Sequence, residues 1–159
     1  MVALSGLIIV IVDVLGIIFL CFIPKYYYRE ACVIFFISQS LTWSLGLCAV
    51  EFSCIIYPIN EFSYANSSSF SFEYFILPLM CVYFNLYYPA NKNIYKKISY
   101  YMIILSVFSA VEYIAEAYTL ILTYVNWHWY YTFISMSIVI YIVRVIYKGF
   151  FKLPKPFSL

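Results

Sequence analysis

Charge is scarce in this 159-residue sequence, in which 10% of the residues are charged and 66% are hydrophobic. A soluble domain of this size needs far more polar surface, so the mean hydropathy of +0.94 predicts that lipid is the solvent. The net charge of +2 is too small to indicate nucleic acid as a partner. The composition therefore predicts an integral membrane protein whose main partner is the lipid bilayer.

Motifs for catalysis and for cofactors are also missing. The sequence has no nucleophile motif, no glycine-rich phosphate loop and no lysine inside an apolar run that would carry retinal. The five cysteines lie singly in apolar stretches, without the paired spacing of a zinc or redox site. We therefore expect no catalytic residue, no metal site and no cofactor. An intramembrane enzyme that acts on lipid is kept as an alternative.

Five apolar segments predict membrane-spanning helices. They cover residues 4–23, 31–50, 72–87, 98–125 and 129–146. A helix needs roughly 20 residues to cross a ~30 Å hydrocarbon core, so the third segment is short and the fourth must tilt or protrude. The expected fold is an all-α integral membrane bundle of five transmembrane helices in a single domain, residues 1–159. A four-span bundle, with the first segment removed or re-entrant, is the alternative.

The basic residues predict the orientation of this bundle. They form three clusters, which are Lys25/Arg29, Lys92/Lys96/Lys97 and Arg144/Lys148/Lys152/Lys155. With five spans all three clusters lie on one side, while the connections 57–71 and 125–128 carry no basic residue. The positive-inside rule then places the amino terminus outside and the carboxyl terminus in the cytoplasm, in a bacterial cytoplasmic membrane. Asn66 begins a glycosylation sequon, but a three-residue pattern in a serine-rich loop is weak evidence for glycosylation. Pro154 and Pro156 prevent the last helix from continuing into the tail.

The fourth segment carries a polar stripe. Its members recur at intervals of three and four, which places them on one helical face, and they are Ser106, Ser109, Glu112, Glu116, Thr119 and Thr123. Glu112 and Glu116 are one turn apart, and two negative charges repel strongly in a low dielectric. At least one of them is expected to be protonated or to share a cation. The alternative is that both carboxyls are neutral and only form hydrogen bonds to neighbouring helices.

The only histidine, His128, stands at the start of the fifth segment. A short external turn between the fourth and fifth segments would bring it near Glu116 and Thr123, where it can help to bind a proton or a small ligand. The alternative is an interfacial histidine in an aromatic belt, in which Trp127 and Trp129 act as anchors.

Asp13 lies about midway along the first segment, the most costly depth for a carboxylate. It should be protonated or paired through hydrogen bonds, with partners from the second segment. That segment carries two ladders of small residues suited to close helix packing, Ser38/Thr42/Gly46 and Ser40/Ser44/Cys48.

Two further glutamates and a proline bear on the site. Glu51 and Glu73 fall near the predicted outer boundary, where with Glu116 and His128 they would rim a vestibule that attracts cations or amines. The alternative is that these glutamates simply face water. Pro78 is expected to kink the third helix and to free a carbonyl for a neighbour or a ligand.

Residues from Ile59 to Ser137 carry a family resemblance. The matching features are Asn60-Glu61-Phe62, Leu77-Pro78, Tyr87-Tyr88-Pro89, the basic loop Lys92 to Lys97, Glu112, and Trp127 fifteen residues later. In this pattern the chain resembles a family of small polytopic membrane proteins common in spore-forming bacteria. The resemblance points to Glu112 and Trp127 rather than to Glu116, and it implies no mechanism. The chain departs from the family pattern at His128, where asparagine is expected, and at Thr132, where serine is usual.

Together these patterns predict a carboxylate-centred polar site between helices. Such a site would bind or conduct a proton, a cation or a small amine-bearing ligand, with Glu112 at its centre and Glu116, Asp13 and His128 as further members. The alternative is a non-catalytic partner subunit or homo-oligomer, in which the polar stripes join helices of this chain to another copy or to another membrane protein.

Overall fold

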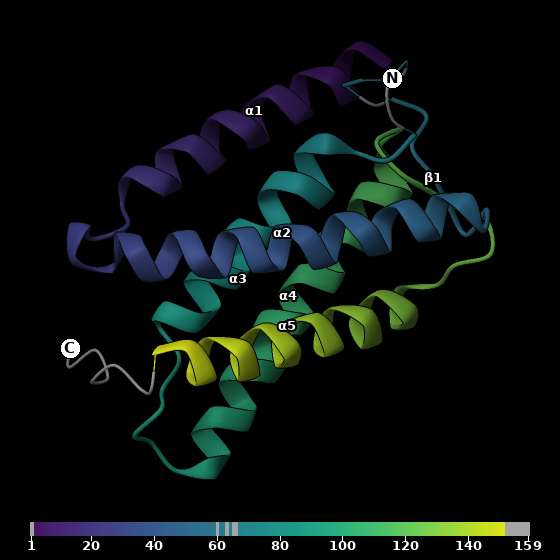
Figure 1. Ribbon diagram of the computed structural model, residues 1–159. Helices are drawn as coiled ribbons and strands as arrows, with labels where there is room; N and C mark the ends of the chain where they lie inside the picture. Colours follow the sequence, from purple (N-terminus) through teal and green to yellow (C-terminus); the bar gives the residue numbers. More distant parts are fainter. Residues whose placement is uncertain (1, 60, 63, 65–66, 152–159) are drawn as a thin grey trace.

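The computed structural model describes residues 2–59, 61–62, 64 and 67–151, and every structural statement below concerns these residues. Asn60 of the family pattern, the sequon at Asn66 and the tail with Pro154 and Pro156 lie outside the described residues. Apart from one short ribbon of two strands and the loops between elements, the described chain is helical (Figure 1). The all-α part of the prediction is therefore confirmed.

Five α-helices make up most of the fold. They are α1 (Val2–Cys21), α2 (Tyr28–Glu51), α3 (Leu77–Leu86), α4 (Ile94–Tyr118) and α5 (Trp129–Phe151). A short 3-10 helix, η1 (Lys25–Tyr27), precedes α2, and a π-helix, η2 (Phe70–Ile76), runs directly into α3. Four of the helices, α1, α2 with η1, α4 and α5, are long and apolar enough to cross a membrane. The helix formed by η2 and α3 is apolar but shorter.

The outer surface of the helices is largely apolar. α1 buries only Ser5, Ile9 and Gly16, and its many large apolar side chains point outward. α1 packs mainly on η2 and forms one side of the molecule. A folded soluble protein does not leave such a continuous apolar surface uncovered, whereas a helix that faces lipid presents one.

The fourth helix is shorter than predicted. The expectation of one helix through Val125 is wrong, because α4 ends at Tyr118 and Thr119 adopts an extended backbone. The Thr119 N–H and hydroxyl both donate to the carbonyl of Ala115, at 3.0 and 2.5 Å, and the hydroxyl accepts from the N–H of Ile121 at 3.2 Å, so this side chain caps the end of the helix. The 25 residues of α4 already exceed a ~30 Å core at ~1.5 Å per residue, so nothing requires the helix to continue. The polar stripe therefore ends at Glu116, and Thr123 lies beyond the helix.

The chain beyond α4 forms a ribbon instead. Strand β2 (Thr123–Tyr124) pairs antiparallel with β1 (Ile55–Ile56), with Ile55 opposite Tyr124. Ile55, Tyr57 and Leu122 form a small buried cluster with it. The β-branched residues that alternate through 119–125 favour an extended chain over a helix.

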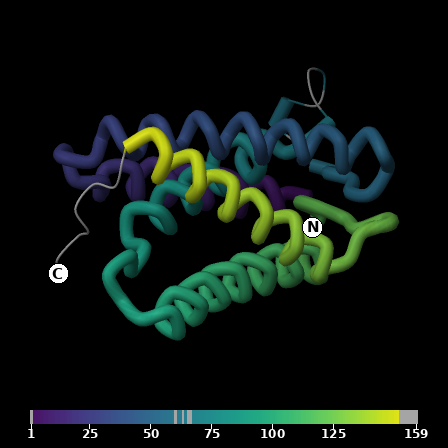
Figure 2. Tube along the Cα trace, turned by 60° about the horizontal axis from the view of Figure 1, so that its bottom comes forward, coloured from purple at the N-terminus to yellow at the C-terminus, as the bar shows by residue number. Residues whose placement is uncertain are grey.

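The molecule has two distinct ends, which Figures 1 and 2 show. The β1–β2 ribbon and the amino terminus lie at one end, here called the ribbon end. The α1–α2 connection, the α3–α4 connection and the carboxyl end of α5 lie at the other, here called the basic end. The described lysines and arginines all belong to these three segments of the basic end.

Pro78 lies in the first turn of α3, directly after η2, and it affects the backbone hydrogen bonds of η2. Because proline has no N–H, one carbonyl in the preceding turn loses its helical donor. The neighbouring helix α2 supplies donors to this turn, since Gln39 Nε2 donates to the Tyr74 carbonyl at 3.0 Å and Thr42 Oγ1 donates to the Glu73 carbonyl at 2.7 Å. The expectation that Pro78 frees a carbonyl for a neighbour is confirmed. These bonds tie η2 to α2 at the position of Glu73.

Candidate functional site

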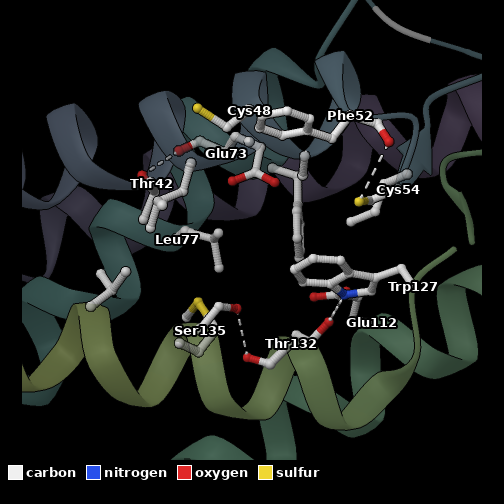
Figure 3. A pocket seen from close by; sticks show the side chains of 17 residues that line it. Thr42, Cys48, Phe52, Cys54, Glu73, Leu77, Glu112, Trp127, Thr132 and Ser135 are labelled. Carbon is white, nitrogen blue, oxygen red and sulfur yellow. Dashed lines mark hydrogen bonds between the residues drawn. The ribbon is translucent and has the colours of Figure 1, made fainter.

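A cavity of about 240 Å³ lies toward the ribbon end, between α2, η2, α4 and α5. Figure 3 shows Glu73 on one side of it and Glu112, Trp127 and Thr132 on the other. Most of the remaining lining is apolar. The cavity therefore combines two carboxyl groups with hydrophobic walls.

Glu73 enters the cavity from η2 and is buried, with 8% of its surface exposed. Tyr57 Oη donates to Glu73 Oε1 at 2.8 Å. Gly46 of α2 makes room for the side chain, because a Cβ at that position would lie 2.7 Å from Glu73 Cδ. The alternative that Glu73 is a boundary residue facing water is wrong, since the π-helix turns its side chain into the bundle.

Glu112 enters the same cavity from α4 and is 5% exposed. Its Oε1 accepts two hydrogen bonds, from Thr132 Oγ1 at 2.6 Å and from Tyr124 Oη at 2.7 Å. Trp127 Nε1 donates to the same Thr132 hydroxyl at 2.8 Å. Trp127, which was expected to be an interface anchor, thus lies in one hydrogen-bonded network with Glu112.

The ribbon supplies one phenol to each carboxyl group. Tyr57 directly follows β1, and Tyr124 belongs to β2. Burial raises the pKa of Tyr57 well above 10.0, and the Glu73 carboxyl raises it further. Burial and the Glu112 carboxyl likewise raise the pKa of Tyr124. Both phenols therefore remain protonated at neutral pH and act as hydrogen-bond donors to the two glutamates.

The charge of the cavity is uncompensated within the described chain. The hydrogen bonds to Glu73 and Glu112 all reach Oε1, and neither Oε2 has a hydrogen bond among the described residues. No described lysine or arginine lines the cavity. Two ionised carboxylates in such a low-dielectric space would repel each other, and each would also lose its hydration. The arrangement is thus suited to hold a proton or to take up a cation.

Asp13 does not line this cavity. Its Oδ2 accepts from Ser71 Oγ at 2.6 Å, so its partner comes from η2 and not from the second span as expected. Asp13 Oδ1 is buried without a hydrogen-bond partner among the described residues. Nearby, Glu61 accepts from the N–H groups of Phe70 and Ser71 at 3.0 and 3.1 Å, which satisfies free donors at the start of η2.

The other predicted site residues also lie outside the cavity lining. His128 is exposed, and its ring stacks on Tyr130 with the ring centroids 5.2 Å apart. Glu116 is half-buried on α4, and none of the described contacts joins it to His128. Glu51 and Trp129 are exposed.

A second polar cluster at the basic end was not predicted. Tyr147 Oη donates to the buried Glu30 Oε2 at 2.7 Å. Arg144 Nη1 donates to the carbonyl and the side-chain oxygen of Asn85 at 3.3 and 3.4 Å, and its guanidinium lies 4.1 Å from the centre of the Tyr88 ring. We call these five residues the basic-end cluster. Glu30 directly follows Arg29 of the first basic cluster in the sequence.

Comparison with protein-family models, with curated proteins and with solved structures finds no match to this chain. The fold and the cavity by themselves define a helical protein with several helices able to cross a membrane and with two carboxyl groups inside one cavity. Any functional assignment therefore rests on the residues that line the cavity.

Proposed function

We propose that this protein is a multi-pass integral membrane protein that binds a cation between Glu73 and Glu112. Its five spans would be α1, α2 with η1, η2 with α3, α4, and α5, in a bacterial cytoplasmic membrane. The apolar outer surface supports this assignment, and so does the gathering of the described cations at one end. By the positive-inside rule the basic end is cytoplasmic, and the ribbon end and the amino terminus are outside.

One observation carries the proposed binding function. Glu73 and Glu112 are each more than nine-tenths buried, they line one cavity, and no described basic residue compensates them. In a membrane protein, buried carboxyl groups of this kind mark proton, ion or ligand sites. The bound species would be a proton, an inorganic cation or a small amine, and transport or sensing would follow from its uptake near the outer end of the bundle.

The test is the unfolding temperature of the purified protein in detergent, measured with inorganic cations, with small amines and over a pH series. A ligand that binds only the folded state stabilises it, by about 2.7 kcal/mol at 100 times its Kd. We expect at least one cation to stabilise the wild type and not the double variant Glu73→Gln/Glu112→Gln. Glu51→Gln is the control, because it removes a carboxyl charge from an exposed position. Identical responses of the wild type and the double variant would refute the proposal.

A further inference from the structure

The size of the cavity restricts the ligand. Its volume of about 240 Å³ lies below the ~300–1,000 Å³ of pockets that hold drug-sized molecules. A molecule with a single ring, or an aliphatic chain of similar volume, fits such a space. Larger ligands would require the walls to move.

The two carboxyl groups favour a positively charged molecule. Glu73 and Glu112 each keep Oε2 without a hydrogen bond among the described residues, although their side chains are more than nine-tenths buried. An ammonium group carries three N–H donors, enough to donate to more than one carboxyl oxygen. Charge-assisted hydrogen bonds of this type are among the strongest in proteins.

The remaining walls favour an organic cation over a metal ion. Calcium takes six to eight oxygen ligands, and magnesium needs a near-octahedral set. The described residues contain no group of three or more histidine, cysteine or acidic side chains that would hold a metal ion. Instead, the cavity offers hydrocarbon and aromatic surface from Leu45, Phe52, Phe72, Leu77 and Met136. Such walls match the apolar body of an amine.

Trp127 adds a second feature suited to an ammonium group. Its indole lines the cavity on the same side as Glu112, and the hydrogen bond from Nε1 to Thr132 fixes the ring (Figure 3). Indole is the aromatic ring that attracts cations most strongly. The cationic end of a ligand near Glu112 would therefore also lie near an aromatic surface.

We infer that the ligand is a small hydrophobic amine, whose ammonium group lies between Glu73 and Glu112 and whose apolar body contacts the walls of the cavity. This inference rests on the proposed function and narrows it. Phenethylamine and cyclohexylmethylamine are suitable probes, because each carries one ammonium group on a single ring.

The experiment measures binding of these two amines to the purified full-length protein at pH 7 by calorimetry and by thermal shift. The neutral analogues phenethyl alcohol and cyclohexylmethanol have nearly the same shape and control for partition into detergent. Each amine is expected to bind at least about tenfold more tightly than its alcohol, because hydrogen bonds between charged groups are lost with the alcohol. Glu112→Gln should reduce this difference and Glu73→Gln/Glu112→Gln should abolish it, while Glu51→Gln should preserve it.

A second variant tests the apolar wall. Met136→Ala enlarges the cavity and leaves both glutamates in place. The variant should therefore bind an amine with a longer apolar chain more tightly, relative to the two probe amines, than the wild type does. Circular dichroism and the unfolding temperature establish whether each variant is folded. Equal binding of amines and alcohols would overturn the inference, and so would binding of sodium, potassium, magnesium, calcium or protons without any amine. The latter result would leave the proposed function intact, whereas no cation uptake at all would overturn both.

Discussion

The cavity and the basic-end cluster use the same hydrogen bond in different settings. Glu73 and Glu30 are both buried, and each accepts from a tyrosine hydroxyl, at 2.8 and 2.7 Å. At the basic end, the Arg144 guanidinium lies 5.5 Å from the ring of the same Tyr147, so a positive charge is close by. In the cavity the nearby charge belongs to a second carboxyl group, and there is free volume. Under the proposed function, Glu30, whose tyrosine donor lies near a guanidinium, has a structural role, whereas Glu73 and Glu112 around free volume form the binding site.

The largest expected effect is the loss of cation binding when both glutamates of the cavity are replaced, because the basic-end cluster is expected to contribute nothing to binding. Glu73→Gln/Glu112→Gln should weaken cation binding by about 2–5 kcal/mol, because a buried charge loses its partner. Stability should change little, since a glutamine oxygen can still accept from Tyr57, Tyr124 and Thr132. Calorimetry and thermal unfolding of the same samples check both points. If the double variant lost stability but kept the wild-type affinity for cations, the roles assigned to the two regions would be reversed.

Gly46→Ala should damage the cavity by a steric route. The new Cβ would lie 2.7 Å from Glu73 Cδ and displace that side chain, at a cost of about 1–3 kcal/mol in stability. Cation binding should weaken with it. Gly6→Ala is the control, because a Cβ at Gly6 meets nothing within 4 Å. Equal unfolding temperatures for the two variants would show that Glu73 does not depend on this glycine.

Tyr147→Phe tests the basic-end cluster. It removes the described donor to Glu30 and should cost about 1–2 kcal/mol of stability, because a buried acceptor is left without a hydrogen bond. Cation binding should remain at the wild-type level. Tyr141→Phe, at an exposed position on the same helix, is the control. A large loss of binding in Tyr147→Phe would mean that the cluster belongs to the ligand site.

The smallest expected effect is a dependence on alkaline pH. The pKa of Tyr57 is raised in the folded state, so its contribution to stability is complete below pH 10.0 and is lost as the pH rises through the folded-state value. Tyr57→Phe should lower stability by about 0.5–1.5 kcal/mol at neutral pH. It should also reduce the fall in unfolding temperature above pH 10. An unchanged alkaline fall in Tyr57→Phe would assign that fall to other groups.

Apolar runs were enough to predict the helices, but not where the fourth one ends. The segment 98–125 has no proline or glycine to mark a stop. The end at Tyr118 depends on the Thr119 hydroxyl and on pairing with β1, which lies more than sixty residues earlier in the chain. A strand of two residues is too short to show a recognisable pattern in the sequence, so its pairing with a distant strand could not be predicted.

The candidate site was predicted only in part. Glu112 was correctly predicted to lie inside the bundle, because it belongs to a polar helical face within an otherwise apolar segment. Glu73 was misplaced because hydropathy puts it at the start of a span, while its burial depends on the π-helix and on Gly46. Of the two small-residue ladders on α2, only the one formed by Ser38, Thr42 and Gly46 is buried. The choice between two such ladders depends on the neighbouring helix, which periodicity does not reveal.

The most direct test of the central claim is infrared difference spectroscopy of the carboxyl groups during cation uptake. Binding should change the carboxyl bands of the wild type, because the ligand alters the charge or the hydrogen bonding of Glu73 and Glu112. The double variant Glu73→Gln/Glu112→Gln should lose these bands, and Tyr147→Phe should keep them. A difference spectrum that survives unchanged in the double variant would contradict the claim that these two glutamates form the cation site.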